Sequence, residues 1–299
     1  MATTTSITTS YAGEKLQGFI SAALLSANTI EKGGVTVKPN VKFKQVIKKL
    51  STTDLVADGT CDFDATTTVA LTERYLEPKE FQVNLQLCKQ DFRDDWDAIS
   101  MGMSAHDSIP PAFSDYLLGH VVSKVAEKIE NTIFGGDDSV AGEFDGLLAL
   151  AGADADVIDV AGTTIDASNV IAELGKVVDA IPTTVYGQED LSVYISPSTA
   201  RAYIRAQAAL GYKDLYHVGQ TALDFEGVKL FVSNGMPANK MMAAQSGNLM
   251  YGTGLLNDKN VAKVIDMADI DGSQNVRIVL RYTATVNFGI GSEIVLYSA

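Results

Sequence analysis

The sequence is poor in the residues from which most catalytic and metal sites are built. It has three histidines, two cysteines and one tryptophan among 299 residues. His106, His120 and His217 are far apart, and none belongs to an HExxH motif or lies beside a cysteine, so a zinc site is not expected. Cys61 and Cys88 are too few to form a disulfide framework in so long a chain. We expect both to be reduced, as in proteins that fold in a cytosol.

The motifs of common enzyme classes are also missing. The sequence has no GxSxG elbow, no P-loop and no GxGxxG after a predicted strand, and its cysteines lack the context of papain-like or caspase-like nucleophiles. Gly252-Thr253-Gly254 is interpreted as a turn and not as a phosphate-binding loop. We therefore assign no catalytic, cofactor-binding or metal-binding residue, and we expect no enzymatic activity and no cofactor.

Long apolar runs and an excess of basic residues are absent as well. No apolar run approaches the ~20 residues of a membrane-spanning helix, and the first residues, MATTTSITTSYAG, lack the basic and apolar regions of a secretory signal. The formal net charge of −14 argues against a nucleic-acid reader and against binding to an anionic membrane surface. The composition itself, 46% hydrophobic and 20% charged, is that of a folded protein with one large or two ordinary domains.

The strongest pattern that is present lies in mid-chain, over Pro110–Phe134. Its two leading prolines suit the first turn of a helix, and Gly135-Gly136 ends it. Apolar residues recur at helical spacing at Phe113, Leu117, Leu118, Val121, Val122, Val125, Ile129 and Ile133. We predict an amphipathic helix ~37 Å long. Its apolar face should pack on strands at Glu80–Leu87 and Val276–Ile290, and its charged face should be at least partly exposed.

The chain before this helix is less regular. Residues 1–40 begin with a Thr/Ser tract that cannot form a core by itself, followed by a short helical stripe at Leu16, Phe19, Ile20, Ala23 and Leu24. The stripe predicts either an arm that docks on a neighbouring surface, of its own chain or of another subunit, or a packed helix of a single domain.

In residues Val35–Leu87 the apolar residues recur with a period of two, which is typical of strands. Gly59, in an Asp/Thr-rich segment, marks the end of a hairpin. Its strands carry few apolar residues, and a polar two-stranded hairpin is not stable alone in water. It must therefore lie on another surface, and another copy of the chain is one candidate for that surface. Lys42, Lys44, Lys48 and Lys49 form a basic edge, interpreted either as a solvated face or as an inter-subunit salt-bridge edge. A short helix around Phe92 and Trp96 follows, at Gln90–Ile99.

After Gly136, strand and helix patterns alternate. The predicted helices are Ile165–Ile181, capped by Asp166 or Ser168, and a helix opened by Ser196-Pro197 that runs to about Leu210. The predicted strands are Leu191–Ile195, Gly227–Ser233, Gly247–Leu255, Val261–Met267 and a final long strand, Val276–Tyr297, and Asn234–Pro237 is a turn.

Carboxylates gather in three loops of this second half. They are Asp137, Asp138, Glu143 and Asp145, then Asp154, Asp156 and Asp159, then Asp269 and Asp271. The third loop begins like a calcium-binding EF-hand loop, but Leu280 stands where the twelfth-position glutamate is needed, so we interpret it as a turn between strands. The other two are interpreted as solvated loops, with weak metal binding as the alternative. A carboxylate pair for glycoside hydrolysis stays open, because nothing singles out one pair.

The last third of the chain resembles the major capsid proteins of tailed bacteriophages that share the HK97 fold. The resemblance lies in the strand and "MP" turn of Gly227–Pro237, the strand with a Leu-x-x-Asp loop at Gly247–Asp258, the short strand Val261–Met267 and the closing strand Arg281–Tyr297. The segment VYISPSTARAYIRAQ, Val193–Gln207, is similar to a strand and helix of the family's axial domain.

This resemblance implies an α+β fold with the family's order of parts. It implies an N-terminal arm at 1–40, an extended hairpin called the E-loop at 41–80, a peripheral domain at 81–139 and 267–299 with a spine helix at 110–134, and an axial α/β domain at 140–266. The family's Lys–Asn crosslink is not carried over, because its three positions find no match in this sequence. An arm of this length leaves no room for a cleaved scaffolding domain.

The function implied is that of a head shell. The chain would assemble into hexamers and pentamers that enclose double-stranded DNA, contacted without sequence specificity, in the capsid of a virion assembled in the host cytoplasm. Its other partners would be a portal protein and separate scaffolding or decoration proteins, with no membrane. Two alternatives remain: an encapsulin-like nanocompartment shell, and an acidic α/β metal-dependent enzyme that uses the Asp137–Asp145 loop.

Overall fold

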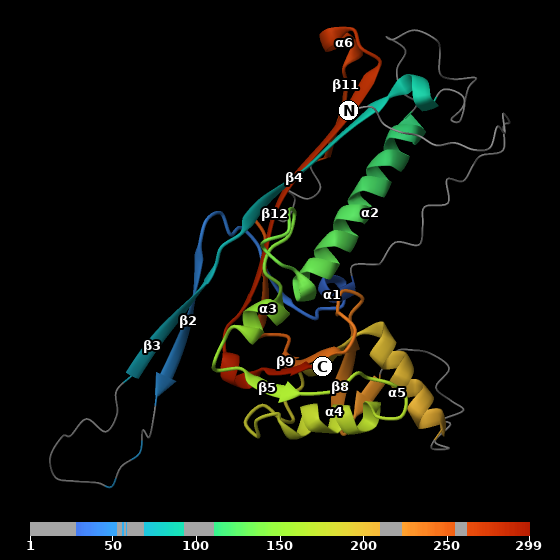
Figure 1. Cartoon of the computed structure of the whole chain (residues 1–299). Coiled ribbons are helices and arrows are strands. Elements are labelled where there is room, and N and C mark those ends of the chain that lie inside the picture. Colours follow the sequence, from blue (N-terminus) through green and yellow to red (C-terminus); the bar gives the residue numbers. More distant parts are fainter. Residues whose placement is uncertain are drawn as a thin grey trace.

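The computed structural model of the chain describes residues 28–52, 56, 58, 69–92, 111–209, 223–254 and 262–299. Figure 1 shows a long helix beside an extended sheet, a second sheet with helices below them, and a projecting hairpin. In chain order the elements are α1 (Asn28–Glu31), β1 (Thr36–Lys38), β2 (Gln45–Thr52), β3 (Val69–Leu76), β4 (Lys79–Cys88), α2 (Pro111–Gly135), α3 (Leu147–Gly152), β5 (Ile158–Ala161), α4 (Val170–Asp179), β6 (Leu191–Ile195), α5 (Pro197–Ala209), β7 (Leu223–Phe225), β8 (Val228–Val232), β9 (Lys240–Gln245), β10 (Leu249–Gly252), β11 (Ala262–Asp266), α6 (Ala268–Asp271), β12 (Asn275–Phe288) and β13 (Val295–Ser298).

The described strands form three sheets. In the first, β12 is central: it pairs with β4 on one side and with β10 and β11 on the other, and β1 adds to β10. The second has the order β5-β13-β9-β6-β8-β7 and carries α4 and α5. The third is the hairpin of β2 and β3, with Thr52 opposite Val69 at its outer end. The mixed helix and sheet architecture and the hairpin are thus as the sequence predicts.

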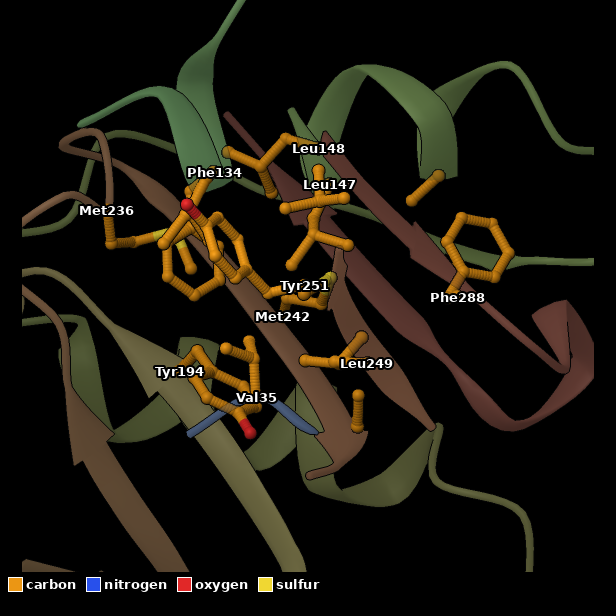
Figure 2. Packing of buried hydrophobic residues seen from close by; sticks show 14 of the residues in the cluster. Val35, Phe134, Leu147, Leu148, Tyr194, Met236, Met242, Leu249, Tyr251 and Phe288 are labelled. Carbon is orange, nitrogen blue, oxygen red and sulfur yellow. The ribbon is translucent and has the colours of Figure 1, made fainter. Parts of the chain in front are cut away.

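The long helix is confirmed as α2, and it is not isolated from the final strands. Val125, Ile129 and Ile133 lie in one buried cluster with Leu280 and Tyr282 of β12, and Phe81 and Val83 of β4 pack against the same cluster. At the end of α2, Phe134 lies 5.6 Å from Tyr194 of β6, between ring centroids, so the cluster also reaches the second sheet (Figure 2). Val122, which the spacing assigns to the apolar face, is 42% exposed.

The predicted strand Val276–Tyr297 is wrong as a single element. The chain leaves the first sheet after Phe288, makes a 3-10 turn at Gly291–Glu293 and enters the second sheet as β13, between β5 and β9. The Asn248 side chain holds this corner: its Oδ1 accepts the N–H groups of Gly289 at 3.0 Å and Ile290 at 2.8 Å, and its Nδ2 donates to the Ile290 carbonyl at 2.8 Å. One run of chain therefore belongs to both sheets.

Strands β5, β7 and β9 are not predicted by the apolar pattern of the sequence. In β9 the four consecutive residues Met241–Ala244 are all buried, because one face of the strand packs in the cluster with α2 and the other in the cluster with α4 and α5. Such a strand shows no alternation of apolar and polar residues. The alternating pattern is informative only where one face of a strand meets solvent.

The two predicted helices of the second half are present, with one change of boundary. Helix α5 begins as predicted, with Ser196 Oγ accepting the Thr199 N–H at 3.2 Å. Helix α4 begins at Val170, five residues later than predicted. The Asp166 carboxylate instead accepts the N–H groups of Ser168 at 2.7 Å and Asn169 at 3.1 Å, which closes a turn before the helix starts.

A buried carboxylate on α2 joins three parts of the chain. Glu130 is fully buried, and it accepts hydrogen bonds from the Thr29 hydroxyl at 2.5 Å, the Thr29 N–H at 3.2 Å and the Ser233 hydroxyl at 3.0 Å. Thr29 belongs to α1 and Ser233 follows β8, so this network fixes the entry of the N-terminal segment between the long helix and the second sheet. A buried carboxylate needs such donors to offset its loss of water.

Candidate assembly interface

Among the described residues, the hairpin of β2 and β3 is anchored to the rest of the protein at its base. This hairpin root consists of Gln45–Ile47 and Arg74–Leu76, which pair with one another in the register. Leu76 is fully buried against Gly252, where a Cβ atom would lie 2.7 Å from the Leu76 Cδ2. Asn287 of β12 donates its side-chain N–H to the Tyr75 carbonyl at 2.6 Å. The hairpin is therefore held at one end and projects from there (Figure 1).

Arg74 is the charged anchor of the root. It forms an ion pair with Asp154, and its guanidinium lies 4.4 Å from the centroid of the Phe288 ring, a cation–π contact. Burial alone would raise the pKa of Asp154, but the Asp156 N–H, Arg74 and nearby Lys49 outweigh it and hold that pKa below its ordinary value. The pair thus ties β3 to the loop between α3 and β5.

Replacing Asp154 with asparagine is expected to loosen the hairpin root. The lost charged hydrogen bond should cost about 1–3 kcal/mol of unfolding free energy, and amide exchange at Arg74–Leu76 should become faster. Because the pKa of Asp154 is lowered on folding, its stabilising effect is fully present above its ordinary pKa of 3.8 and is lost as pH falls below that value. The exposed Asp159, replaced in the same way, is the control, and equal effects of both variants would contradict the assigned role.

The hairpin carries apolar side chains that the chain itself does not cover. Tyr75 is 45% exposed and Leu71 is 54% exposed, and they alternate with Glu73 on one face of β3. Val46, opposite Tyr75, is also exposed, and Phe43, just before β2, is 84% exposed. We call Val46, Leu71 and Tyr75 the outer face of the hairpin. Clustered exposed apolar residues of this kind mark an interaction surface more often than isolated ones do.

Lysines accompany this surface. Lys44 lies 3.8 Å from the centroid of the Tyr75 ring and 3.9 Å from a Glu77 carboxylate oxygen, and Lys48 stands opposite Glu73 in the register. With Lys42 and Lys49, four lysines and no acidic residue lie between residues 42 and 52 of an otherwise acidic chain. The predicted basic edge is present, and both of its interpretations remain predictions.

The acidic loop after α2 is held together by its own neighbours. Asp138 forms an ion pair with Lys79, and Glu143 forms one with Lys128. Glu143 also accepts the Asp137 N–H at 3.1 Å, and Asp145 accepts the Asp138 N–H at 3.0 Å. The Lys128 hydrogen bond lowers the pKa of Glu143, and hydrogen bonds from Ser139 lower that of Asp137. These contacts give the carboxylates the role of closing the loop.

The remaining sequence-level candidates are not brought together. Within the described part of the chain, no three His, Cys, Asp or Glu residues are placed to hold a metal ion. Asp269–Ser273 forms α6 and a left-handed turn at Gly272 between β11 and β12, as interpreted from the sequence. His106, His217, Cys61, Trp96 and the apolar stripe Leu16–Leu24 lie outside the described residues. No described helix is long and apolar enough to cross a membrane.

Comparison with solved structures identifies the fold. No family model and no curated protein matches the sequence. The capsid of an empty GTA particle matches with a TM-score of 0.65 and 16% identity, over 94% of this chain and 93% of that one. Gordonia phage Cozz matches with a TM-score of 0.61, 11% identity and coverage of 96% and 90%. The SrpI encapsulin of Synechococcus elongatus PCC 7942 matches with a TM-score of 0.56, 10% identity and coverage of 92% and 88%.

Proposed function

We propose that this chain, whose architecture is the HK97-like fold of these shells, is the major capsid protein of a tailed bacteriophage. The observation that carries the proposal is the likeness to phage and GTA capsid chains over nearly the whole length of both partners. The hairpin adds independent support, because its outer face stays uncovered in the single chain. A structural and non-enzymatic role also agrees with the acidic loop, whose carboxylates bind lysines and backbone N–H groups.

The proposed domains follow the division predicted from the sequence, except where a strand pairs in the sheet of the other domain. Residues 1–40 are the arm and 41–80 the E-loop, which contains the β2–β3 hairpin. The peripheral domain contains α2 and the first sheet, so it includes β10 and β11, which the sequence assigns to the range 140–266, and β1 of the arm adds to the edge of this sheet. The axial domain contains the second sheet, so it takes β13 from the range 267–299. No catalytic, cofactor or metal residue is assigned.

Assembly works by repetition of one contact. The outer face of each hairpin docks on the neighbouring subunit, and covering a large apolar side chain contributes about 1.5–3 kcal/mol. Each subunit both gives and receives the hairpin, which is a head-to-tail contact that closes into rings. Hexamers and pentamers of this kind form the head shell of the virion. A portal, separate scaffolding or decoration proteins and non-specifically contacted double-stranded DNA complete the list of partners, and assembly takes place in the host cytoplasm.

Electron microscopy of the purified full chain tests this function. The expected result is rings and closed shells, formed by the chain alone or after addition of co-purifying scaffold. Sedimentation under the same conditions measures the fraction assembled. A chain that stays monomeric at every salt concentration, pH and protein concentration tried would overturn the proposal.

The second candidate is an encapsulin-like compartment shell, which the likeness to the SrpI encapsulin favours. Both candidates predict shells, so the contents distinguish them. Nuclease-resistant DNA inside particles from the natural source, or genes for a portal and a terminase beside the coding sequence, supports the phage capsid. A single enzyme found as cargo supports the compartment.

A further inference from the structure

A cavity of about 370 Å³ lies between the hairpin root and the corner at Asn248. Ile47 lines it from β2, Met250 from β10 and Ile290 from the corner, and all three side chains are only half-buried. A Cβ atom on Gly289 would lie 3.8 Å from the Ile47 Cγ2 and 3.8 Å from the Met250 Cε, so the glycine leaves the space between them open. We call this space the root cavity. Its volume is in the range of sites for small molecules.

The charged groups around the root cavity are two lysines and one glutamate. Lys48 and Lys49 line it from β2, and Glu293 lines it from the 3-10 turn after the corner. Among the described residues, none of these three side chains has an ion pair or a hydrogen bond. Because two positive groups stand against one negative group, and no ion-pair partner neutralises them, the cavity favours an anion over a cation.

Lys49 is the better placed of the two lysines to hold an anion inside the cavity. Side chains two residues apart share a face of a strand, so Lys49 lies on the same face of β2 as Ile47, and Lys48 lies on the opposite face. Lys49 also helps to lower the pKa of Asp154, which places its ammonium group on the body side of the hairpin. That carboxylate is already paired with Arg74. The charge of Lys49 is therefore available to a ligand.

We propose that the root cavity binds a small amphipathic anion, a molecule with a carboxylate group on a compact apolar body. The carboxylate lies at Lys49, and the apolar body covers Ile47, Met250 and Ile290. A singly charged group suits one ammonium better than a doubly charged phosphate does, since Glu293 also faces the cavity. The bound molecule touches both the hairpin and the corner, so it restrains the tilt of the hairpin about its root. This site belongs to the single chain and does not depend on the proposed function.

Titration of the unassembled full chain with phenylbutyrate, followed by methyl NMR, tests the inference. The methyl signals of Ile47, Met250 and Ile290 should shift together and saturate, with a dissociation constant of about 1 mM or tighter for a molecule of this size. The signal of Ile204, which is exposed on α5, should stay in place. Phenylbutylamine, with the same apolar body and the opposite charge, should bind at least about tenfold more weakly. Absence of saturable shifts, or equal binding of the amine, would overturn the proposal.

Charge variants test the position of the carboxylate. Lys49→Gln should weaken the binding of phenylbutyrate about tenfold, because a charge-assisted hydrogen bond is lost. Lys42→Gln removes an exposed lysine that does not line the cavity, and it should bind like the wild type. Glu293→Gln removes the like charge and should bind at least as tightly as the wild type. Equal binding by the two lysine variants, or weaker binding by Glu293→Gln, would overturn the assigned orientation.

Hydrogen exchange tests the restraint of the hairpin. With phenylbutyrate bound, the amides of the hairpin root should exchange more slowly, and those of α4 should not change. Binding without protection of the root would overturn the restraint. All of these measurements are made on the single chain, so a failure here leaves the capsid function standing, and a chain that forms no shells can still bind the ligand.

Discussion

Replacing Leu71 and Tyr75 together with glutamate is expected to abolish shell assembly without unfolding the subunit. Both side chains are about half exposed in the single chain, so the change costs the subunit little. In the assembly, the variant would lose two apolar contacts and would place two charges in an interface. The lost burial alone amounts to about 4 kcal/mol, or roughly a thousandfold weaker association at each contact. Because a closed shell repeats the contact in every subunit, we expect no shells at concentrations at which the wild type assembles fully.

Sedimentation velocity and electron microscopy measure this loss, and thermal unfolding checks the subunit. Val140→Glu is the matched control, since Val140 is a comparably exposed apolar residue in the acidic loop after α2. The control should assemble. Normal shells of the double variant would contradict the assembly role of the outer face, and a large drop in its unfolding temperature would show that the two side chains stabilise the subunit instead.

Gly235→Ala is expected to produce the largest loss of subunit stability. Gly235 lies in the turn after β8, against the backbone of α2, and a Cβ there would lie 1.9 Å from the Glu130 carbonyl oxygen. That oxygen belongs to a helix and cannot move aside, so either the turn or the helix must shift. The shift would also displace Ser233, which donates to the buried Glu130 carboxylate at 3.0 Å. We expect a loss of about 3 kcal/mol or more.

A second glycine provides the opposite result as a control. Gly175 lies within α4, and a Cβ added there meets nothing within 4 Å. Gly175→Ala should therefore gain about 0.5–1 kcal/mol from its higher helix propensity. Denaturant unfolding of both unassembled variants measures the difference. A Gly235→Ala protein as stable as the wild type would show that the turn does not need its close approach to α2.

Local patterns were sufficient to predict the elements whose signals lie within a few residues. The helix opened by Ser196 and Pro197 and the long helix α2 are of this kind, because caps and helical spacing act over one turn. The break between β12 and β13 was not predictable in this way. The apolar pattern continues past Phe288, and the corner is made by Asn248, forty residues earlier in the chain. Strand β9 was missed because burial on both faces removes the alternation.

For the candidate interface, too, local sequence patterns predicted one part and distant residues determine the other. The period of two and the thin apolar content predicted a hairpin that must lie on something. Which face points outward depends on the anchors of the root: Arg74 binds Asp154, and Leu76 packs on Gly252. These partners are far from the hairpin in sequence, so the pattern of β2 and β3 alone cannot identify them.

The corner at Asn248 has a consequence for the geometry of a shell. Since β12 and β13 are one run of chain bonded into two sheets, the two proposed domains are joined by a short hydrogen-bonded connection and not by a free linker. We expect such a subunit to resist bending between its two domains. In the proposed shell of hexamers and pentamers, copies of the subunit would stand in unequal surroundings. We therefore expect the tilt of the hairpin about its root to differ among copies more than the arrangement of the two domains does.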